Sequence, residues 1–597
     1  MKCLLATGLL SLAAATTPVA VAQPTSERPM GRPVVMGTSG MVAAEHPLEA
    51  LAGMTMLQAG GNAIDAAVAV FYMTSVVEQH QAGIGGDGFL LAYLAQERRV
   101  VFINGTGTAP ELATREFYEK HGEIPSAGPL ATDVPGMAAG IDLALTRYGS
   151  MSYEELLQPA IDAAEGHPLD VWAASQHLRN VEKISPYPSS VQLLMPEGRP
   201  IRAGEIFAQI ELAQTLRTIA EEGADSLYKG ALAKRIGAFY EANGGLLRYG
   251  DLSAFEPEQS EPIMTSYAGL DVYQSAPNSQ GIVMLMALNI LEGYDLRSLG
   301  HNSARYLHLV AEAMKLAFAD RNHYVADPRR VDVPTKELLS KDYAATRRSL
   351  IRDDRALLAP PPGDPIGGRA VATGRDVEYA EGSEPVSRPE TAENLDGETS
   401  SFSIADRFGN LVSVTHSVNA GFGSGMAVAG TGLFLNNRMP YFGLDPDDVN
   451  VLEPGKRTRH TVNPALALKD GKPYLAWNTP GGDNQPQAML QAFLALTHFG
   501  MNVQQAVEAA TVTSSDFAAS MYPGRVRGML TMPESVGAEA AEALAALGHR
   551  VEVIAMQQPY RQSRSGAGAV KMILIDPESG VLHGGVAPAK SNYVIGW

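Results

Sequence analysis

The stretch ETSSFSIADRFGNLVSVTHSV, residues 398–418, carries the strongest structural pattern in this chain. Apolar and polar residues alternate from Thr399 to Asp406 and again from Leu411 to Val418, and a turn sequence separates the two runs. Alternation on both sides of a short turn predicts a β-hairpin. The first strand of this hairpin begins with a hydroxyl residue, Thr399.

The residues before the hairpin have a different composition. The segment 353–398 is rich in Pro, Gly, Asp and Glu and has little apolar periodicity, which predicts an exposed, mobile linker. If the bond before Thr399 were cut there, its new α-amine, with a pKa of ~7.7–8.0, would be partly neutral at pH 7. Such an amine can take the proton of its own residue's hydroxyl and create a nucleophile. Taken alone, however, a hydroxyl run on a strand is more typical of a solvated sheet face.

Helices and strands are predicted on both sides of the hairpin. Before it we expect strands at 40–44, 89–94, 100–104 and 270–275, and helices at 47–59, 65–77, 151–165, 208–222 and 303–320, with Asn62 capping the second helix. After it we expect strands at 465–469, 474–478, 551–554 and 569–575, and helices at 485–499, 503–511 and 535–546. Strands with helices on their faces fit a layered sandwich.

Composition narrows the class of protein. The chain has 597 residues, of which 45% are hydrophobic and 19% charged, as in globular proteins. Its net charge of -19 argues against a nucleic-acid partner, because phosphate binding needs clustered Lys and Arg. No metal-binding motif is present in the sequence, so we expect neither a metal nor another cofactor.

The first 22 residues have the pattern of a signal peptide. Lys2 precedes an apolar run from Leu4 to Ala15, and Ala20 to Ala22 forms a small-x-small cleavage site. The run is shorter than the ~20 residues that span a bilayer. We therefore expect a periplasmic or secreted protein, with no membrane insertion after removal of the signal. Cys3 is the single cysteine, so the mature chain would have no disulfide.

The hairpin and several glycine-rich motifs resemble the gamma-glutamyltranspeptidase family. The motifs are GGNAIDAA at 60–67, GIGGDG at 83–88, GFGSG at 421–425, GLFLNN at 432–437 and TPGGD at 479–483. They follow the family order over nearly the whole mature chain. The resemblance implies an α+β fold, a four-layer αββα sandwich of the N-terminal-nucleophile hydrolase type. It also implies two intertwined chains cut from one precursor, a large chain of residues 23–398 and a small catalytic chain of residues 399–597.

The resemblance also implies roles for particular residues. Thr399 would cut the bond after Glu398 during maturation and then attack a substrate amide, forming an acyl-enzyme. Gly481 and Gly482 would supply backbone N–H groups as an oxyanion hole, although a Gly-Gly pair alone is more often an ordinary turn.

Two further residues of the hairpin are implied as site residues. Ser417 stands where the family has a threonine that orients the nucleophile. Asn419, two residues further along the strand, would point into the same site. Both would fit equally well as polar residues of a strand surface.

The departures from the family concern substrate recognition. Thr106 stands where an arginine would hold a glutamyl carboxylate, Tyr441 stands at the place of an acidic residue, and His460 and Thr461 replace a pair of serines. Threonine cannot form the bidentate clamp that arginine forms on a carboxylate. Arg438 and His460 are therefore candidates for binding a different acyl group, such as one with a carboxylate. The alternative is a surface salt bridge for Arg438 and a structural hydrogen bond for His460.

The expected function is an exported, autoprocessing amide hydrolase or acyltransferase that acts on a small amide or peptide with a non-γ-glutamyl or modified acyl group. One alternative is a true glutathione hydrolase or γ-glutamyl transferase. A second alternative, of a different class, is an exported binding protein that keeps this fold unprocessed.

Overall fold

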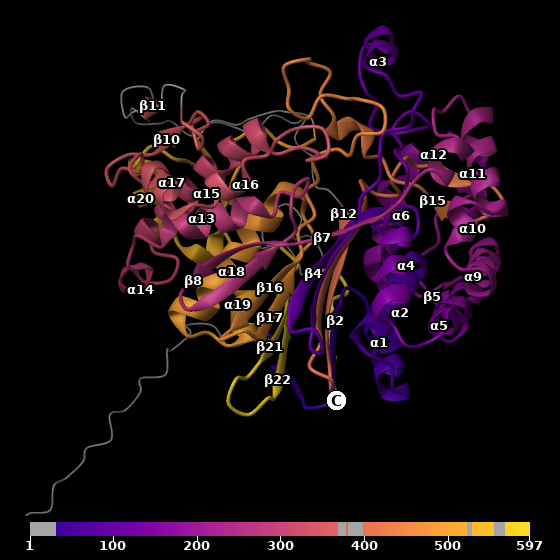
Figure 1. Ribbon diagram of the computed structural model, residues 1–597, viewed down its shortest axis with the longest axis horizontal. Coiled ribbons are helices and arrows are strands. Elements are labelled where there is room, and N and C mark those ends of the chain that lie inside the picture. Colours follow the sequence, from indigo (N-terminus) through magenta and orange to yellow (C-terminus); the bar gives the residue numbers. More distant parts are fainter. Residues whose placement is uncertain (1–30, 368–377, 380–397, 522–527, 555–567) are drawn as a thin grey trace, which may run out of the picture.

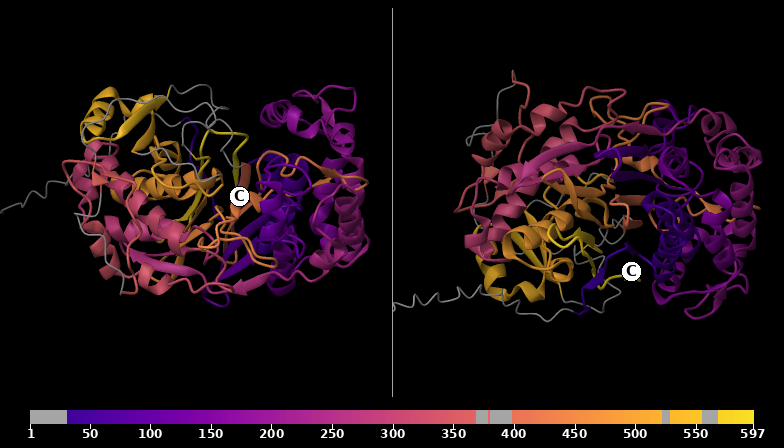
Figure 2. Two further views of the ribbon diagram at one scale, coloured as in Figure 1. Left: turned by 90° about the horizontal axis from the view of Figure 1, so that it is seen from above. Right: turned by 60° about the horizontal axis from the view of Figure 1, so that its bottom comes forward.

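The predicted hairpin lies at the centre of the computed structural model, which describes residues 31–367, 378–379, 398–521, 528–554 and 568–597. Among these residues, two seven-stranded sheets pack face to face, and helices cover the outer face of each sheet (Figure 1). The views in Figure 2 show the same layers from above and from below. The predicted four-layer αββα arrangement is confirmed.

One sheet, here called the hairpin sheet, contains the predicted hairpin in its middle. Its strands, in spatial order, are β23 (Tyr593–Gly596), β2 (Gly40–Ala44), β12 (Glu398–Asp406), β13 (Leu411–Asn419), β3 (Asp87–Leu94), β4 (Arg99–Gly105) and β7 (Glu258–Ser260). All neighbours in it run antiparallel. The hairpin strand β12 thus lies between β2 and β13.

The second sheet packs against the hairpin sheet. Its strands, in spatial order, are β1 (Val35–Gly37), β22 (Leu582–Val586), β21 (Lys571–Ile575), β17 (Lys472–Asn478), β16 (Ala465–Lys469), β9 (Leu270–Gln274) and β8 (Ile263–Tyr267). Strand β22 is not predicted from the sequence, because its LHGGV segment has poor β propensity. Its Gly584 is required by close sheet packing, since a Cβ there would lie 2.6 Å from the Met41 sulfur.

Helices complete the two outer layers. The hairpin sheet is covered by α1 (Pro47–Ala59), α2 (Ala63–Val77), α4 (Met137–Tyr148) and α5 (Tyr153–Glu165), with α9 (Ile210–Glu222) and α11 (Ala231–Ala242) outside them. The second sheet is covered by α13 (Ile282–Leu291), α15 (Ala304–Tyr324), α17 (Lys341–Arg348), α18 (Gln485–Phe499), α19 (Val503–Glu508) and α20 (Ala538–Ala546). The predicted cap of α2 is confirmed, since the Asn62 side chain accepts hydrogen bonds from the Ile64 and Asp65 N–H groups.

Shorter elements surround these layers. The helices are α3 (Arg115–His121), α6 (Val171–Arg179), α7 (Val181–Ile184), α8 (Pro188–Leu194), α10 (Asp225–Tyr228), α12 (Tyr249–Ser253), α14 (Leu296–Leu299) and α16 (Thr335–Leu338). The strands are β5 (His167–Pro168), β6 (Ile206–Phe207), β10 (Leu357–Leu358), β11 (Glu378–Tyr379), β14 (Ala427–Val428), β15 (Leu433–Phe434), β18 (Thr513–Ser514), β19 (Met529–Pro533) and β20 (Arg550–Ile554). No helix in the described part of the chain is both long and apolar enough to cross a bilayer.

The alternation along β12 decides what each face contacts. Phe402 and Ile404 join the apolar cluster beneath the helices, whereas Ala405 joins the cluster between the two sheets. On the inter-sheet side, Ser403 accepts a hydrogen bond from Asn478 of β17 at 2.9 Å. Since side chains alternate across a strand, one sequence pattern serves both layers.

The turn of the hairpin is held by its own side chains. The Asp406 carboxylate accepts hydrogen bonds from the Phe408 and Asn410 N–H groups, each at 2.9 Å. Gly409 has φ 86°, a conformation that glycine adopts without steric cost. This local geometry fixes the register of β12 against β13 and hence the place of the residues at the open end of the hairpin.

The prediction of an exposed linker from residue 353 onward holds for residues 353–355, which are exposed, but is wrong for the two residues that follow. Ala356 and Leu357 are fully buried, and their N–H groups donate to the Leu547 carbonyl and the Glu312 carboxylate at 2.7 and 2.9 Å. The sequence prediction missed these two apolar residues because it rested on the average composition of the segment, which is dominated by polar residues and proline. The rest of the predicted linker, 368–377 and 380–397, lies outside the described residues, as do the predicted signal peptide and its cleavage site.

Candidate active site

Thr399 lies on a β-bulge at the open end of the hairpin. Glu398 pairs with Asn419 and Ser400 with His416, so the register shifts at Thr399. Thr399 is only 2% exposed. Bulges redirect a side chain and interrupt regular pairing, and they are frequent beside active sites. The residue that the sequence singles out thus occupies an irregular, buried position in the sheet.

The carbonyl group before Thr399 has a side-chain donor. The Ser417 hydroxyl donates a hydrogen bond to the Glu398 carbonyl oxygen at 2.5 Å and accepts one from the Asn419 N–H at 2.8 Å. Ser417 is fully buried. A hydrogen bond to a carbonyl oxygen favours nucleophilic attack on its carbon, because negative charge develops on that oxygen.

A chain of hydrogen bonds leads from Asn419 to the diglycine turn. The Tyr441 hydroxyl donates to the Asn419 side-chain oxygen at 3.0 Å and lies 3.2 Å from the Thr461 hydroxyl. The Gln280 amide then donates to the carbonyls of Thr461 and Gly482, at 2.6 and 2.9 Å. The structure therefore connects Asn419, Tyr441, Thr461 and Gly482, which are far apart in the sequence.

The diglycine turn has a conformation that requires glycine. Gly481 has φ 121° and Gly482 has φ 55°, both in the left-handed region. Asp483, the next residue, pairs with the buried Arg321 at 2.5 Å and accepts a hydrogen bond from the Ser520 N–H at 2.7 Å. These contacts anchor Asp483, the residue that directly follows the two glycines.

Arg438 belongs to a buried polar group, here called the Arg438 cluster, made of Asp87, Asn419, Arg438, Tyr441, His460 and Thr461. The Arg438 guanidinium lies 5.1 Å from the centre of the Tyr441 ring, and that ring stacks on His460 with 6.4 Å between ring centres. The Arg438 Nη1 donates a hydrogen bond to the Asn419 side-chain oxygen at 3.4 Å. Arg438 is 1% exposed, so the alternative of a surface salt bridge is wrong.

The Arg438 cluster leaves several polar atoms without hydrogen bonds. Among the described residues, Arg438 Nε and Nη2, His460 Nε2 and Asp87 Oδ2 have no hydrogen-bond partner. Asp87 Oδ2 lies 3.6 Å from His460 Nε2 and 4.0 Å from Arg438 Nε. Its other oxygen accepts hydrogen bonds from the Gly107 and Gly136 N–H groups. Buried polar atoms usually have partners, so this group is suited to receive one.

Burial sets the protonation states near the cluster. Burial, together with the nearby Arg438 charge, lowers the pKa of His460 to about 4. The imidazole is therefore neutral at pH 7. Burial raises the pKa of Asp133 well above its usual value, and the nearby Asp87 raises it further. Arg438 thus provides the positive charge of a site whose histidine is uncharged.

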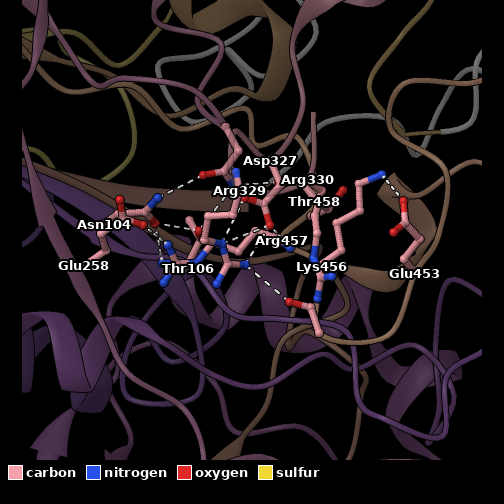
Figure 3. Close-up of polar contacts among 12 residues, drawn as sticks. Asn104, Thr106, Glu258, Asp327, Arg329, Arg330, Glu453, Lys456, Arg457 and Thr458 are labelled. Atoms are coloured by element: carbon pink, nitrogen blue, oxygen red, sulfur yellow. Dashed lines mark hydrogen bonds and ion pairs between the residues drawn. The ribbon is translucent and has the colours of Figure 1, made fainter. Parts of the chain in front are cut away.

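Thr106 lies apart from the Arg438 cluster. Its hydroxyl donates to Asn104 at 2.6 Å and accepts from Asn278 at 3.2 Å. Figure 3 shows Thr106 beside Arg457, whose guanidinium pairs with Glu258 at 2.6 Å. The links of Thr106 to the cluster are indirect. The neighbouring Gly107 N–H donates to Asp87 at 3.0 Å, and Asn278, which donates to the Thr106 hydroxyl, accepts the His460 N–H at its carbonyl at 2.8 Å. The position that the sequence predicts for carboxylate binding therefore carries a neutral, already satisfied hydroxyl.

One group of possible metal ligands occurs in the described part of the chain, on the other side of the molecule's core. His308 and Glu312 of α15 meet His549, with their ligand atoms within 4.8 Å of one another. Glu312 already pairs with Lys315, and His308 Nδ1 lies 2.9 Å from His549 Nε2. A dication would have to compete with the Lys315 ammonium, so this group fits a buried hydrogen-bonded network better than a metal centre.

Sequence reasoning misses several residues of the site. Asp87, the first residue of β3, belongs to a glycine-rich motif in which an acidic residue has no particular signal, and Gln280 lies in a turn between a strand and a helix. Lys590 donates to the Thr399 carbonyl oxygen at 3.1 Å from a segment near the C-terminus. Neither periodicity nor spacing links Lys590 to the hairpin, because it is brought there by the pairing of β23 with β2.

Comparison with known proteins identifies the family. The family model described as gamma-glutamyltranspeptidase matches residues 50–597. The "Glutathione hydrolase-like YwrD proenzyme" of Bacillus subtilis is 35% identical over 565 residues, which cover 94% of this chain and 99% of that protein. The "Acylase ACY 1 proenzyme" of Pseudomonas sp. (strain SE83) is 36% identical over 528 residues, which cover 86% of this chain and 88% of that protein. The crystal structure of cephalosporin acylase from Bacillus halodurans superposes with a TM-score of 0.84 and 33% identity, covering 96% of this chain and 99% of that chain. The chain therefore belongs to the gamma-glutamyltranspeptidase family, whose members are autoprocessing amide hydrolases of the N-terminal-nucleophile type.

Proposed function

We propose that Thr399 is the nucleophile of this enzyme and that the Glu398–Thr399 bond is its processing site. The observation that carries the proposal is the 2.5 Å hydrogen bond from the Ser417 hydroxyl to the Glu398 carbonyl oxygen. It singles out one peptide carbonyl, directly before a buried threonine, for polarisation. Residues 23–398 then form the large chain and residues 399–597 the small chain, after export with removal of residues 1–22.

Processing needs no group beyond the chain and water. The Thr399 hydroxyl oxygen attacks the Glu398 carbonyl carbon, and the charge on the carbonyl oxygen is stabilised by the Ser417 hydroxyl. The carbon–nitrogen bond breaks, the hydroxyl proton ends on the nitrogen, and an ester joins Glu398 to Thr399. This acyl shift frees the α-amine of Thr399, and water then hydrolyses the ester, which releases the Glu398 carboxylate and restores the Thr399 hydroxyl.

Turnover uses the new α-amine as the base. In its neutral form it accepts the hydroxyl proton while the Thr399 oxygen attacks the substrate carbonyl. The oxyanion is placed at the Gly481 and Gly482 N–H groups, which have no acceptor in the described part of the chain. The leaving amine takes the proton, and water or an amine acceptor then releases the acyl group from Thr399.

The acyl group is proposed to carry a carboxylate that binds Arg438. The guanidinium is buried, two of its nitrogens are unpartnered among the described residues, and Asn419 connects it to Ser417. A charge-assisted hydrogen bond in such surroundings is strong and directional. The absence of an arginine at Thr106 weakens γ-glutamyl recognition, so we propose a modified or non-γ-glutamyl acyl group.

The experiment compares p-nitroanilides of glutaryl, succinyl, γ-glutamyl and butyryl groups on the purified enzyme. The first two are expected to be cleaved with a higher kcat/KM than the uncharged butyryl compound. Arg438→Ala is expected to lower kcat/KM about 10²-fold for the carboxylate-bearing groups and to change it little for butyryl, because a desolvated pair loses its partner. Arg457→Ala removes another buried arginine, near Thr106, and is the matched control.

Two results would overturn the recognition proposal. One is an equal loss for charged and uncharged acyl groups in Arg438→Ala, which indicates a structural arginine. The other is preferred release of glutamate from glutathione, which favours the glutathione hydrolase alternative.

A further inference from the structure

The side chain of Glu398 lies in a basic environment beside Thr399. The Lys590 ammonium is 3.9 Å from the Glu398 carboxylate and donates a hydrogen bond to the Thr399 carbonyl oxygen at 3.1 Å. Lys590 has φ 51°, a left-handed conformation that costs a non-glycine residue about 1–2 kcal/mol. Strained residues persist where the surrounding structure holds them, and they are frequent at functional sites.

This environment is on the opposite flank of β12 from Ser417 and Asn419. Strand β12 pairs with β13 on one side and with β2 on the other. Lys590 precedes β23, which pairs with β2, and it also binds Glu45, the residue that follows β2. Two basic groups thus lie near Thr399. The Arg438 cluster is linked to β13 through Asn419, whereas Lys590 comes from the segment before β23 and meets Gln81, whose carbonyl accepts a hydrogen bond from the Val418 N–H of β13 at 2.9 Å.

Two N–H donors beside Lys590 have no acceptor. The Gln81 side-chain oxygen accepts a hydrogen bond from the Lys590 ammonium, but in the described structure its Nε2 has no partner, although Gln81 is fully buried. The indole Nε1 of Trp172, a residue 2% exposed, is also without a partner there, and the Trp172 ring centre lies 5.8 Å from the Lys590 nitrogen. Unpaired N–H donors around an ammonium group are suited to bind an anion.

The Lys590 ammonium lies among buried acidic side chains, of which Glu398 is one. The Glu45 carboxylate is shared between Lys571 at 2.9 Å and Lys590 at 3.3 Å. Burial raises the pKa of Glu398, and Lys590 opposes that rise, followed by the more distant Arg179 and Lys183. When the Glu398 side chain leaves, Lys590 loses one carboxylate neighbour and keeps Glu45, which it shares with Lys571, and the buried Glu78, whose pKa burial raises well above its usual value. An anion that enters there would restore the lost partner of the buried ammonium.

We propose that Lys590, Gln81 and Trp172 form an anion site that is partly occupied by Glu398, through its contact with Lys590, in the uncleaved chain and that binds a substrate carboxylate in the processed enzyme. The inference rests on the proposed cleavage between Glu398 and Thr399. Because the acyl group is assigned to the β13 side, this carboxylate belongs to the amine side of the scissile amide, as in an amino acid or a peptide C-terminus.

The test uses acetate as the probe and follows the melting temperature at constant ionic strength, with chloride as the balancing anion. Thr399→Ala keeps Glu398 in place and is expected to show no response to acetate. The double variant Thr399→Ala/Glu398→Ala empties the site and is expected to show a saturable rise in melting temperature. The processed wild-type enzyme is expected to show the same rise.

Substitutions of the site's donors separate a specific site from general salt effects. Adding Trp172→Phe to the double variant removes one N–H and keeps an aromatic side chain, so the apparent acetate affinity should fall several-fold. Adding Lys590→Met should abolish the response. If Lys590→Met does not fold, Trp172→Phe decides alone, and an unchanged acetate affinity in it overturns the proposed site.

The outcomes also distinguish this inference from the proposed function. If the wild type is cleaved before Thr399 but neither it nor the double variant responds to acetate, the anion site is wrong and the cleavage stands. If the wild type stays uncut while the double variant responds and the Thr399→Ala variant does not, the anion site stands but its use in a processed enzyme is wrong.

Discussion

The two flanks of β12 hold Thr399 by different means. On the β13 side the contacts nearest Thr399 are hydrogen bonds between uncharged groups, from Ser417 to the Glu398 carbonyl at 2.5 Å and from Tyr441 to Asn419 at 3.0 Å, and the charged Arg438 is reached only through Asn419. On the β2 side they are contacts between charged groups, with the Lys590 ammonium binding the Glu45 carboxylate at 3.3 Å. The first set places a hydroxyl donor on the carbonyl oxygen of Glu398. The second set balances the charge of the Lys590 ammonium with a carboxylate.

The difference shows how one strand can serve two steps of a reaction sequence. Neutral donors lose little on desolvation and can act on a carbonyl oxygen that becomes negative only during attack. A buried ion network is stable only while its charges are matched, so loss of one member creates a binding site. The β13 flank is therefore assigned to bond breaking and acyl binding, and the β2 flank to exchange of one carboxylate for another.

The largest expected effect concerns the β13 flank during processing. Ser417→Ala removes the donor to the Glu398 carbonyl oxygen and is expected to slow processing ~10²–10³-fold, as loss of an oxyanion donor does. Ser417→Thr keeps the hydroxyl and should process normally. Processing half-times measured by denaturing gel check both.

The matched control for this variant is Thr415→Val, two residues earlier on the same strand. The Thr415 hydroxyl is buried and has no hydrogen-bond partner in the described structure. It should process at the wild-type rate. Equal slowing in Ser417→Ala and Thr415→Val would show that lost packing, not a lost hydrogen bond, slows processing. It would contradict the role assigned to Ser417.

A smaller effect is expected for turnover alone. Gly481→Ala places a Cβ at φ 121°, which rotates the turn that points N–H groups at the substrate oxyanion. We expect processing to continue, because Ser417 serves that step, while kcat falls about 10²-fold. Separate assays of chain cleavage and p-nitroanilide hydrolysis measure the two steps.

Gly471→Ala controls for backbone strain. Gly471 also has a positive φ, 72°, but a Cβ there would meet nothing within 4 Å, and the residue lies in the β16–β17 turn. It should leave kcat unchanged. Loss of processing together with turnover in Gly481→Ala would mean that both steps share one oxyanion site.

The smallest effect is on the pH dependence of stability, and it has opposite signs for the two flanks. Burial, with the neighbouring Glu45, raises the pKa of Glu49 on the β2 side to about 8. The folded state then keeps a proton that the unfolded state releases, so the free energy of unfolding falls as pH rises from about 5 to 8. Glu49→Gln should remove up to about 1.4 kcal/mol per pH unit of that slope.

On the β13 side the sign reverses. Burial lowers the pKa of His416 to about 3, so the folded state lacks a proton that the unfolded state binds below pH 6.5. Stability is then lost as pH falls from 6.5 to 3, and His416→Phe should reduce this loss. Urea unfolding of the uncleaved Thr399→Ala chain at several pH values measures both slopes, and parallel curves for variant and parent would contradict the assignment.

The two flanks also differ in how far sequence reveals them. The hairpin predicts the place of Ser417 and Asn419, because local alternation and a tight turn fix which residues face Thr399. Lys590, Glu45 and Gln81 come from separate segments that only sheet order brings together, and no local pattern encodes sheet order. Burial likewise could not be predicted for Arg438, since a lone arginine is usually exposed.

The central claim is tested most directly by intact-mass measurement of the purified wild-type protein beside Thr399→Ala and Thr399→Ser. The account predicts two fragments for the wild type, the smaller beginning at Thr399, and one uncut chain for Thr399→Ala. Thr399→Ser keeps a hydroxyl nucleophile and should also give two fragments, at a rate that differs from that of the wild type. A wild type that remains whole, a cut at another bond, or the same cut in Thr399→Ala would contradict Thr399 as the nucleophile.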